Sequence, residues 1–201
     1  MDIVRLDHAE SAPSRAESGG SDPTYVARVT EASGGILRVI VVMGVAGAGK
    51  TEVGRALATA IGWPFEEADD YHTTANKEKM ARGEGLTDAD RAPWLAALEA
   101  FVAGTVERDA RAVLACSVLK EKYRAALIPP NAPRGAVRFV YLDVPRDVLE
   151  TRLRDRHGHF AGPTLLDSQL ATLEKPRDAV WIDGTRPVPE IVQTIRPALG
   201  V

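Results

Sequence analysis

The sequence lacks the features that define several large classes of protein. Its 201 residues include one cysteine, Cys116, so no disulfide can form within the chain, and only 5% are aromatic. No apolar run approaches the ~20 residues that cross a bilayer, and the first residues are too polar for a secretory signal. The 28 acidic residues outnumber 25 basic ones, and a net charge of -3 provides no broad positive field for nucleic acid or an anionic membrane. We therefore expect a cytoplasmic protein that binds neither, with Cys116 as a small buried apolar residue.

What the chain does contain is apolar sequence, 45% of its residues, enough for one domain of ordinary size. Residues 1–34 are rich in serine, glycine, alanine and charge, so we expect a flexible tail ahead of one domain at 35–201. Short β-branched runs then alternate with longer helical patterns, which predicts a parallel sheet covered by helices on both faces, an α/β fold. Strands are expected at 36–43, 63–68, 111–117, 136–144 and 179–183, with helices beginning near 51, 89, 119, 146 and 164.

The stretch VVMGVAGAGKTEVG, residues 41–54, sets glycines between a strand-like run and a helical pattern. It fits the phosphate-binding pattern G-x-x-x-x-G-K-[ST] in the order strand, loop, helix. Glycines let successive backbone N–H groups turn toward an anion, and the positive end of the helix dipole adds to that attraction. A lysine in the first helical turn costs about a few tenths of a kcal/mol unless an anion lies there. The loop expected to bind the ATP phosphates consists of Gly44, Val45, Ala46, Gly47, Ala48, Gly49, Lys50 and Thr51.

Within this loop, Lys50 is expected to bridge the β- and γ-phosphates, and the Thr51 hydroxyl to join the Mg²⁺ shell. A glycine-rich turn that only connects strand to helix is the alternative. Because a kinase, a hydrolase and a switch protein can all bind a nucleotide, the acceptor side has to be considered separately.

The region 66–95 carries more charged and polar side chains than a connector needs. Glu67 and Asp69 come at the end of the second expected strand, two residues apart and so on the same side of an extended chain. One such carboxylate can take the proton of an attacking hydroxyl while the other lies near the metal. The alternative is an acidic, solvated loop in which Asp88 caps the following helix.

Three separated blocks carry a family resemblance. They are 67–95, with Glu67-Ala68-Asp69, His72 and the run DADRAPWL; ACSVLKEKYRAAL at 115–127; and RLRDRHGHFAGPTLLDSQLATLEKP at 152–176. In this order they resemble the gluconate kinases, small P-loop kinases similar to shikimate kinase. The resemblance implies a three-layer P-loop kinase fold with a lid and the strand order 2-3-1-4-5. It also implies a homodimer that uses ATP and Mg²⁺ to phosphorylate the 6-hydroxyl of D-gluconate.

The resemblance further implies roles for single residues. Asp69 is the base or hydroxyl-orienting carboxylate, and Glu67 reaches the metal through water. Gluconate needs a cation and hydrogen-bonding groups, and the residues expected around it are Asp69, His72, Arg91, Lys120 and Arg124. Lys120 follows the third strand's carboxyl end, where open α/β sheets bind ligands. The alternatives are surface cations for Arg91 and Arg124 and a helix-entry residue for His72.

Arg152 and Arg156 lie four residues apart, on one helix face, ahead of a glycine-flanked loop, which suits a mobile lid. Arg156 is expected to neutralise charge on the transferring phosphoryl group, and Arg152 to lie against the adenine. The alternative is two cations that only complement a helix dipole. Trp94 is expected in the core rather than as a platform for the substrate.

The chain departs from the family pattern in its acceptor region. Ala68 stands where the family has glycine, Glu67 where it has aspartate, and Thr73 and Gly85 where it has prolines. The part after Pro176 is shorter than usual, so no adenine contacts are assigned there. Two alternative functions stay open: a kinase for another polyol acid such as shikimate, and an ATP-dependent switch protein with no acceptor.

Overall fold

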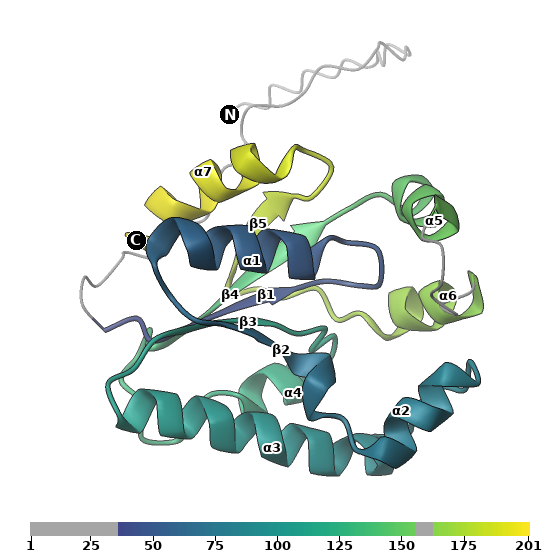
Figure 1. Ribbon diagram of the computed structural model, residues 1–201, viewed down its shortest axis with the longest axis horizontal. Helices are drawn as coiled ribbons and strands as arrows, with labels where there is room; N and C mark the ends of the chain where they lie inside the picture. The colour runs from purple at the N-terminus through teal and green to yellow at the C-terminus, as the bar shows by residue number, and fades with distance from the viewer. Residues whose placement is uncertain (1–35, 156–162) are drawn as a thin grey trace, which may run out of the picture.

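A parallel sheet of five strands runs through the molecule in the order β2-β3-β1-β4-β5 (Figure 1). The computed structural model describes residues 36–155 and 163–201. The strands are β1 (Val39–Met43), β2 (Phe65–Glu67), β3 (Ala112–Ala115), β4 (Val137–Asp143) and β5 (Ala179–Asp183). All four pairings are parallel, which confirms the sheet and the strand order expected from the sequence.

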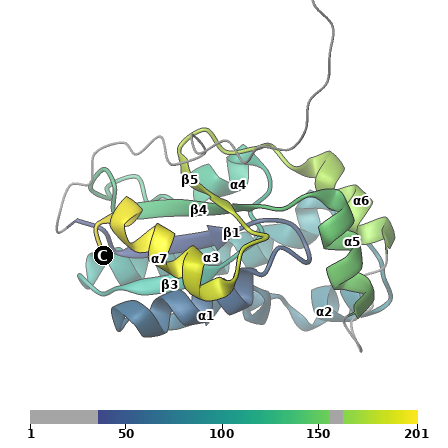
Figure 2. The same ribbon diagram turned by 90° about the horizontal axis from the view of Figure 1, so that it is seen from above.

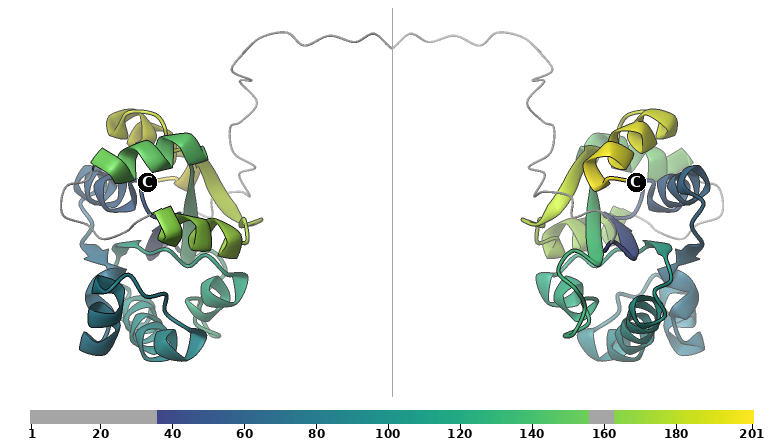
Figure 3. Two further views of the ribbon diagram at one scale, coloured as in Figure 1. Left: turned by 90° about the vertical axis from the view of Figure 1, so that its right-hand side faces the viewer. Right: turned by 90° about the vertical axis from the view of Figure 1, so that its left-hand side faces the viewer.

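Helices cover both faces, so that the end views in Figure 3 show three layers. The helices are α1 (Lys50–Ile61), α2 (Thr74–Ala81), α3 (Asp88–Glu107), α4 (Glu121–Ala126), α5 (Arg146–Asp155), α6 (Pro163–Thr172), α7 (Val188–Leu199) and the 3₁₀ helix η1 (Ala68–Tyr71). In the described part of the chain, none of them has the length and apolar character that a membrane span requires.

The central strand β1 supplies both halves of the core because its side chains alternate between the two faces of the sheet. Ile40 and Val42 belong to a buried cluster shared with α1 and α7. The other residues of β1 belong to a second cluster, which includes Trp94 and Leu98 of α3. Figure 2 shows α1 and α7 over one face of the sheet.

The carboxyl ends of the strands meet at one edge, where α2, α5 and α6 also lie (Figure 1). The phosphate loop follows β1, η1 follows β2, and Cys116 follows β3. Cys116 is 1% exposed, as expected, and burial raises the pKa of its thiol. Ligand sites in open α/β sheets lie at this edge, so the functional residues are expected there.

Candidate active site

The loop between β1 and α1 has a backbone that depends on glycine. Gly47 has φ 81° and Gly49 has φ 93°, values in the left-handed region that side chains disfavour. A Cβ at position 47 would also lie 3.2 Å from Cγ of Leu153 in α5. Gly49 is the N-cap of α1, whose first backbone N–H groups have no acceptor inside the helix. The loop therefore presents donors and a helix's positive end at one place.

Side chains at the start of α1 connect this loop to β2. The Nζ of Lys50 donates to the carbonyl of Val45 at 3.1 Å, so the lysine folds back along the loop. The hydroxyl of Thr51 donates to Oε2 of Glu67 at 2.7 Å. Burial raises the pKa of Glu67, and the charge of Asp69 raises it further, while Thr51 and Lys50 oppose the rise. A cation here would relieve the cost of the half-buried carboxylate.

Asp69 does not lie on an extended chain, so that expectation was wrong. The strand β2 ends at Glu67, and Asp69 lies in η1. The buried indole of Trp94 donates from Nε1 to the carbonyl of Ala68 at 2.7 Å and so holds η1 against α3. Asp69 still lies near enough to Glu67 for its charge to raise the pKa of that carboxyl, so the two carboxylates are neighbours.

Trp94 also contacts His72, the residue that follows η1. The two rings stack with their centroids 4.7 Å apart and their planes 8° apart. The Nδ2 of Asn76 donates to the carbonyl of Asp90 at 2.7 Å and lies 3.4 Å from Nδ1 of His72. Because an amide nitrogen can only donate hydrogen bonds, Nδ1 of His72 is the acceptor in this contact. The proton of the neutral imidazole is therefore on Nε2.

The charge state of His72 depends on the same surroundings. Burial lowers the pKa of His72, and the charges of Arg91 and Lys77 lower it further, while Asp69 opposes them. The charges of Asp69 and Arg91 thus both act on His72, and burial, the largest effect, favours its neutral form.

Asp88 forms ion pairs with cations at the start of α3 and the start of α4. It is not the N-cap of α3, so the alternative interpretation of Asp88 as a capping residue is wrong. The cap is Thr87, in a capping box with Asp90. Asp88 instead accepts from Lys120 at 3.1 Å, from Lys122 at 2.5 Å and from the hydroxyl of Tyr123. Lys122, then Tyr123 and Lys120, hold the pKa of the Asp88 carboxyl well below its usual range.

Arg91 completes this cluster, with Nη1 3.9 Å from Asp88 Oδ1 and 2.6 Å from the carbonyl of Leu86, to which it donates. Three cations, Arg91, Lys120 and Lys122, thus surround one carboxylate, which leaves two positive charges in excess. Such an excess suits an anionic ligand.

Arg124 is 7% exposed, so the alternative of a surface cation is wrong. Its Nη1 donates to the carbonyls of Val118 and Leu119, both in the loop after β3. Val118 has φ 25°, an unusual value for a β-branched residue, and Arg124 supports the backbone there. The side chain thus stabilises the loop from which Lys120 extends.

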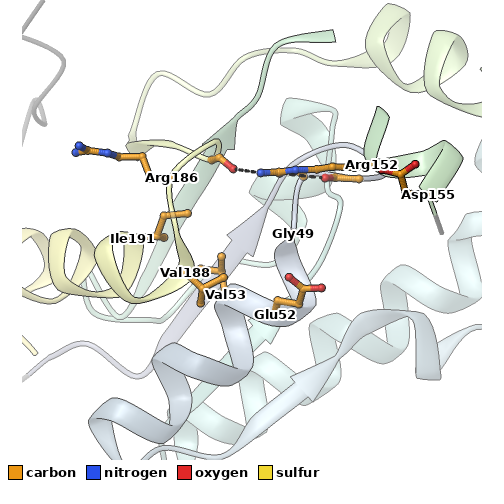
Figure 4. Close-up of a pocket in the computed structure, with 11 residues that line it drawn as sticks. Gly49, Glu52, Val53, Arg152, Asp155, Arg186, Val188 and Ile191 are labelled. Carbon is orange, nitrogen blue, oxygen red and sulfur yellow. Dashed lines mark hydrogen bonds between the residues drawn. The ribbon is translucent and has the colours of Figure 1, made fainter. Parts of the chain in front are cut away.

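A pocket opens beside the phosphate loop on the side of β5 (Figure 4). Arg152 donates to the carbonyls of Gly184 at 2.9 Å and Gly47 at 3.4 Å, so its guanidinium bridges the two loops. The other lining residues are Ala48, Gly49, Glu52, Val53, Asp155, Arg186, Val188 and Ile191. Arg156, predicted beside the transferring phosphate, lies outside the described residues.

The structure brings most of the predicted residues to one edge of the sheet, in two groups. Lys50, Thr51, Glu67 and Arg152 surround the phosphate loop. The second group lies between η1 and the start of α4. The charges of Asp69 and Arg91 act on His72, and Asp88 joins Arg91 to Lys120. Sequence reasoning missed the pocket residues after β5, although a loop at the carboxyl end of a parallel strand was a signal for them. It also missed Asn76 as the partner of His72.

A phosphate loop between the central strand and its helix, within this strand order, defines the class of P-loop kinases. A family model described as "AAA domain" matches residues 39–176, more than half of the chain. The crystal structure of a shikimate kinase from Aquifex aeolicus has a TM-score of 0.58 and covers 81% of this chain and 96% of that one. At 19% identity, this similarity concerns the fold alone.

Relatives with higher sequence identity show which family of P-loop kinases this chain resembles. A gluconokinase from Gluconobacter oxydans is 50% identical over 141 residues, which are 70% of this chain and 78% of that protein. The crystal structure of a gluconokinase from Sinorhizobium meliloti is 41% identical with a TM-score of 0.72, over 82% of this chain and 93% of that one. The chain belongs to the gluconokinase family.

Proposed function

We propose that this chain transfers the γ-phosphoryl group of ATP to the 6-hydroxyl of D-gluconate, giving ADP and 6-phospho-D-gluconate. Similar proteins from Gluconobacter oxydans and Sinorhizobium meliloti are named gluconokinases. The observation that carries the proposal is the cluster around Asp88, with its excess of two positive charges at the same sheet edge as the phosphate loop. An acceptor with a carboxylate fits that excess, and a neutral sugar does not.

On the donor side, the loop from Gly44 to Thr51 holds the ATP phosphates through its backbone N–H groups other than that of Ala46, which donates to Gln169. Lys50 leaves the Val45 carbonyl to bridge the β- and γ-phosphates. The pocket after β5 takes the adenine, against the guanidinium of Arg152, which two carbonyls already hold in place. Arg156 neutralises charge on the transferring group, as the family resemblance implies.

The residues present also suit Mg²⁺. The Thr51 hydroxyl and the Glu67 carboxylate are oxygen donors 2.7 Å apart, the type that Mg²⁺ prefers. No group of three or more His, Cys, Asp or Glu among the described residues could hold a metal alone, which fits an ion that phosphates and water also ligate. Mg²⁺ would neutralise charge on the β- and γ-phosphates. Thr51 would hold it directly, and Glu67 would hold it through water, as the family resemblance implies.

On the acceptor side, Asp69 orients the 6-hydroxyl of gluconate and takes its proton as the new O–P bond forms and the bond to ADP breaks. His72 donates from Nε2 to a substrate hydroxyl. Arg91 and Lys120 bind the carboxylate. We assign Arg124 to the support of the loop behind them rather than to direct contact, because its guanidinium is buried on two carbonyls.

The proposal is tested by measuring ADP release by the purified protein with three acceptors. D-gluconate should raise turnover steeply, whereas D-glucose, which has the same 6-hydroxyl but no carboxylate, should give little. Phosphorus NMR of the product should place the phosphate on the 6-oxygen. Turnover with shikimate equal to that with gluconate would favour the alternative kinase, and tight ATP binding with no response to any acceptor would favour a switch protein.

Three wider proposals accompany this one. A homodimer is inferred from the family resemblance, and light scattering of the purified chain would measure its mass. A division into a tail at 1–34 and a domain at 35–201 predicts that removal of the tail leaves activity unchanged. A cytoplasmic enzyme of carbohydrate metabolism fits an ATP-dependent reaction, and fractionation of cells would locate it.

A further inference from the structure

The segment from Gln169 to Glu174 has no role in the reaction as described so far, yet it contacts both sides of the site. It comprises the end of α6 and the first residues of the chain that leads to β5. Figure 1 shows α6 beside the carboxyl ends of the strands.

Gln169 contacts the phosphate loop. Its Oε1 accepts a hydrogen bond from the backbone N–H of Ala46 at 2.6 Å, between residues 123 positions apart. The helix that carries Gln169 is well anchored, since Leu166 is 1% exposed and Leu170 packs against the core cluster of β1, α1 and α7. The contact therefore comes from a packed helix beside the loop.

Glu174, five residues later, contacts the acceptor side. Its carboxylate accepts from the backbone N–H of Glu121 at 2.6 Å, and its own N–H donates to the carbonyl of Leu119 at 2.9 Å. These two bonds bracket Lys120, which the proposed function assigns to the gluconate carboxylate. Between Gln169 and Glu174, Leu173 packs against both core clusters.

These contacts fix two pieces of backbone relative to each other. The hydrogen bond to Gln169 fixes the orientation of the Ala46 peptide, and this also fixes the orientation of the neighbouring amides of the phosphate loop. The bonds of Glu174 do the same for residues 119–121. Phosphoryl transfer depends on the spacing of donor phosphate and acceptor oxygen, and a misplacement of about 1 Å can cost on the order of 10²-fold in rate.

We propose that Gln169 and Glu174 are positioning residues, and that the short segment joining them holds the phosphate loop and the Lys120 loop at the spacing that transfer requires. The inference rests on the proposed function. Gln169 acts through the Ala46 peptide on the donor side, and Glu174 through Lys120 on the acceptor side.

The first test compares Gln169→Ala and Gln169→Glu with a matched control, Gln193→Ala, which removes an exposed glutamine of α7. Gln169→Ala should lower kcat on the order of tenfold or more, with KM for gluconate unchanged. Gln169→Glu keeps an acceptor for Ala46 but adds a negative charge near ATP. It should recover most of kcat while KM for ATP rises about tenfold, a split that a merely structural role would not produce.

The second test concerns Glu174. Glu174→Ala should raise KM for gluconate about fivefold or more and leave KM for ATP unchanged. Glu174→Gln keeps an acceptor oxygen and should behave like the wild type, as should Glu99→Ala, which removes an exposed glutamate of α3. Because the two residues act through one segment, their effects on kcat/KM for gluconate should not be independent. The fold-loss of kcat/KM in the double variant Gln169→Ala/Glu174→Ala should be smaller than the product of the two single fold-losses.

The inference fails if Gln169→Ala retains kcat within twofold of Gln193→Ala, if Gln169→Glu is no better than Gln169→Ala, or if the losses in the double variant multiply. Thermal unfolding of each variant separates these outcomes from loss of fold. A wild-type protein without gluconate-dependent turnover would instead refute the proposed function, so the two failures are distinguishable.

Discussion

Replacement of Trp94 by phenylalanine should destabilise the domain and slow the reaction together. The indole is 5% exposed and its Nε1 donates to the Ala68 carbonyl at 2.7 Å. Loss of that hydrogen bond costs about 1 kcal/mol, and the cavity left by the smaller ring adds about 1 to 2. The free energy of unfolding should therefore fall by about 2 to 3 kcal/mol, which lowers Tm by about 5 to 10 °C.

The same hydrogen bond holds η1, which carries Asp69, so kcat should fall on the order of tenfold as that carboxylate loses its fixed place. Urea unfolding and steady-state kinetics measure the two effects. The matched control is Trp63→Phe. Trp63 is half-buried, and Cζ of Arg111 lies 5.4 Å from the centroid of its ring. The free energy of unfolding of this variant should fall by less than about 1 kcal/mol. If Trp94→Phe costs no more than Trp63→Phe and kcat stays at the wild-type value, the role of the indole in fixing η1 is refuted.

Three further predictions concern single side chains. Asp69→Asn should lower kcat on the order of 10³-fold while ATP binding, measured by calorimetry, stays near the wild-type value; equal loss of both would contradict its role as the base. Thr51→Ala should lower kcat/KM at least about tenfold and raise the Mg²⁺ concentration needed for half-maximal rate, whereas Thr51→Ser should retain most of the rate. The pKa of His72 lies below its unfolded value of about 6.5, so the unfolded chain takes up the proton first and stability is lost as pH falls from about 6.5 through the folded pKa. Urea unfolding at several pH values should show this slope in the wild type and a weaker one in His72→Gln; identical slopes would contradict it.

The phosphate loop could be predicted from the sequence because its chemistry is local. Gly47 and Gly49 adopt backbone angles that glycine favours, and the strand and helix on either side are set by periodic patterns of a few residues. The strand order followed from the family resemblance. The apolar stripe of α7, with Ile191, Ile195 and Leu199 on one face, is a local pattern of the same kind, although no helix was predicted there.

The acceptor side was predictable in its residue types but not in its contacts. Asp88 meets Lys120 and Lys122 from more than 30 positions away, a pairing that depends on how α3 packs beside α4. Asp69 was expected on an extended chain, yet the strand stops where Trp94, 26 positions away, binds the Ala68 carbonyl. Arg124 has the sequence context of a surface helix residue, and only tertiary packing buries it. Such contacts have no period or spacing that a single sequence displays.

The buried thiol at the end of β3 makes this protein a convenient subject for labelling experiments. As the chain's only cysteine, 1% exposed and with a raised pKa, Cys116 can react with an aromatic disulfide reagent only when the surrounding strands open. Its modification rate under native conditions therefore reports the opening of the sheet next to the Lys120 loop, and gluconate or ATP should slow it. A second cysteine placed on an exposed helix can take a fluorophore selectively, with the native thiol left in place.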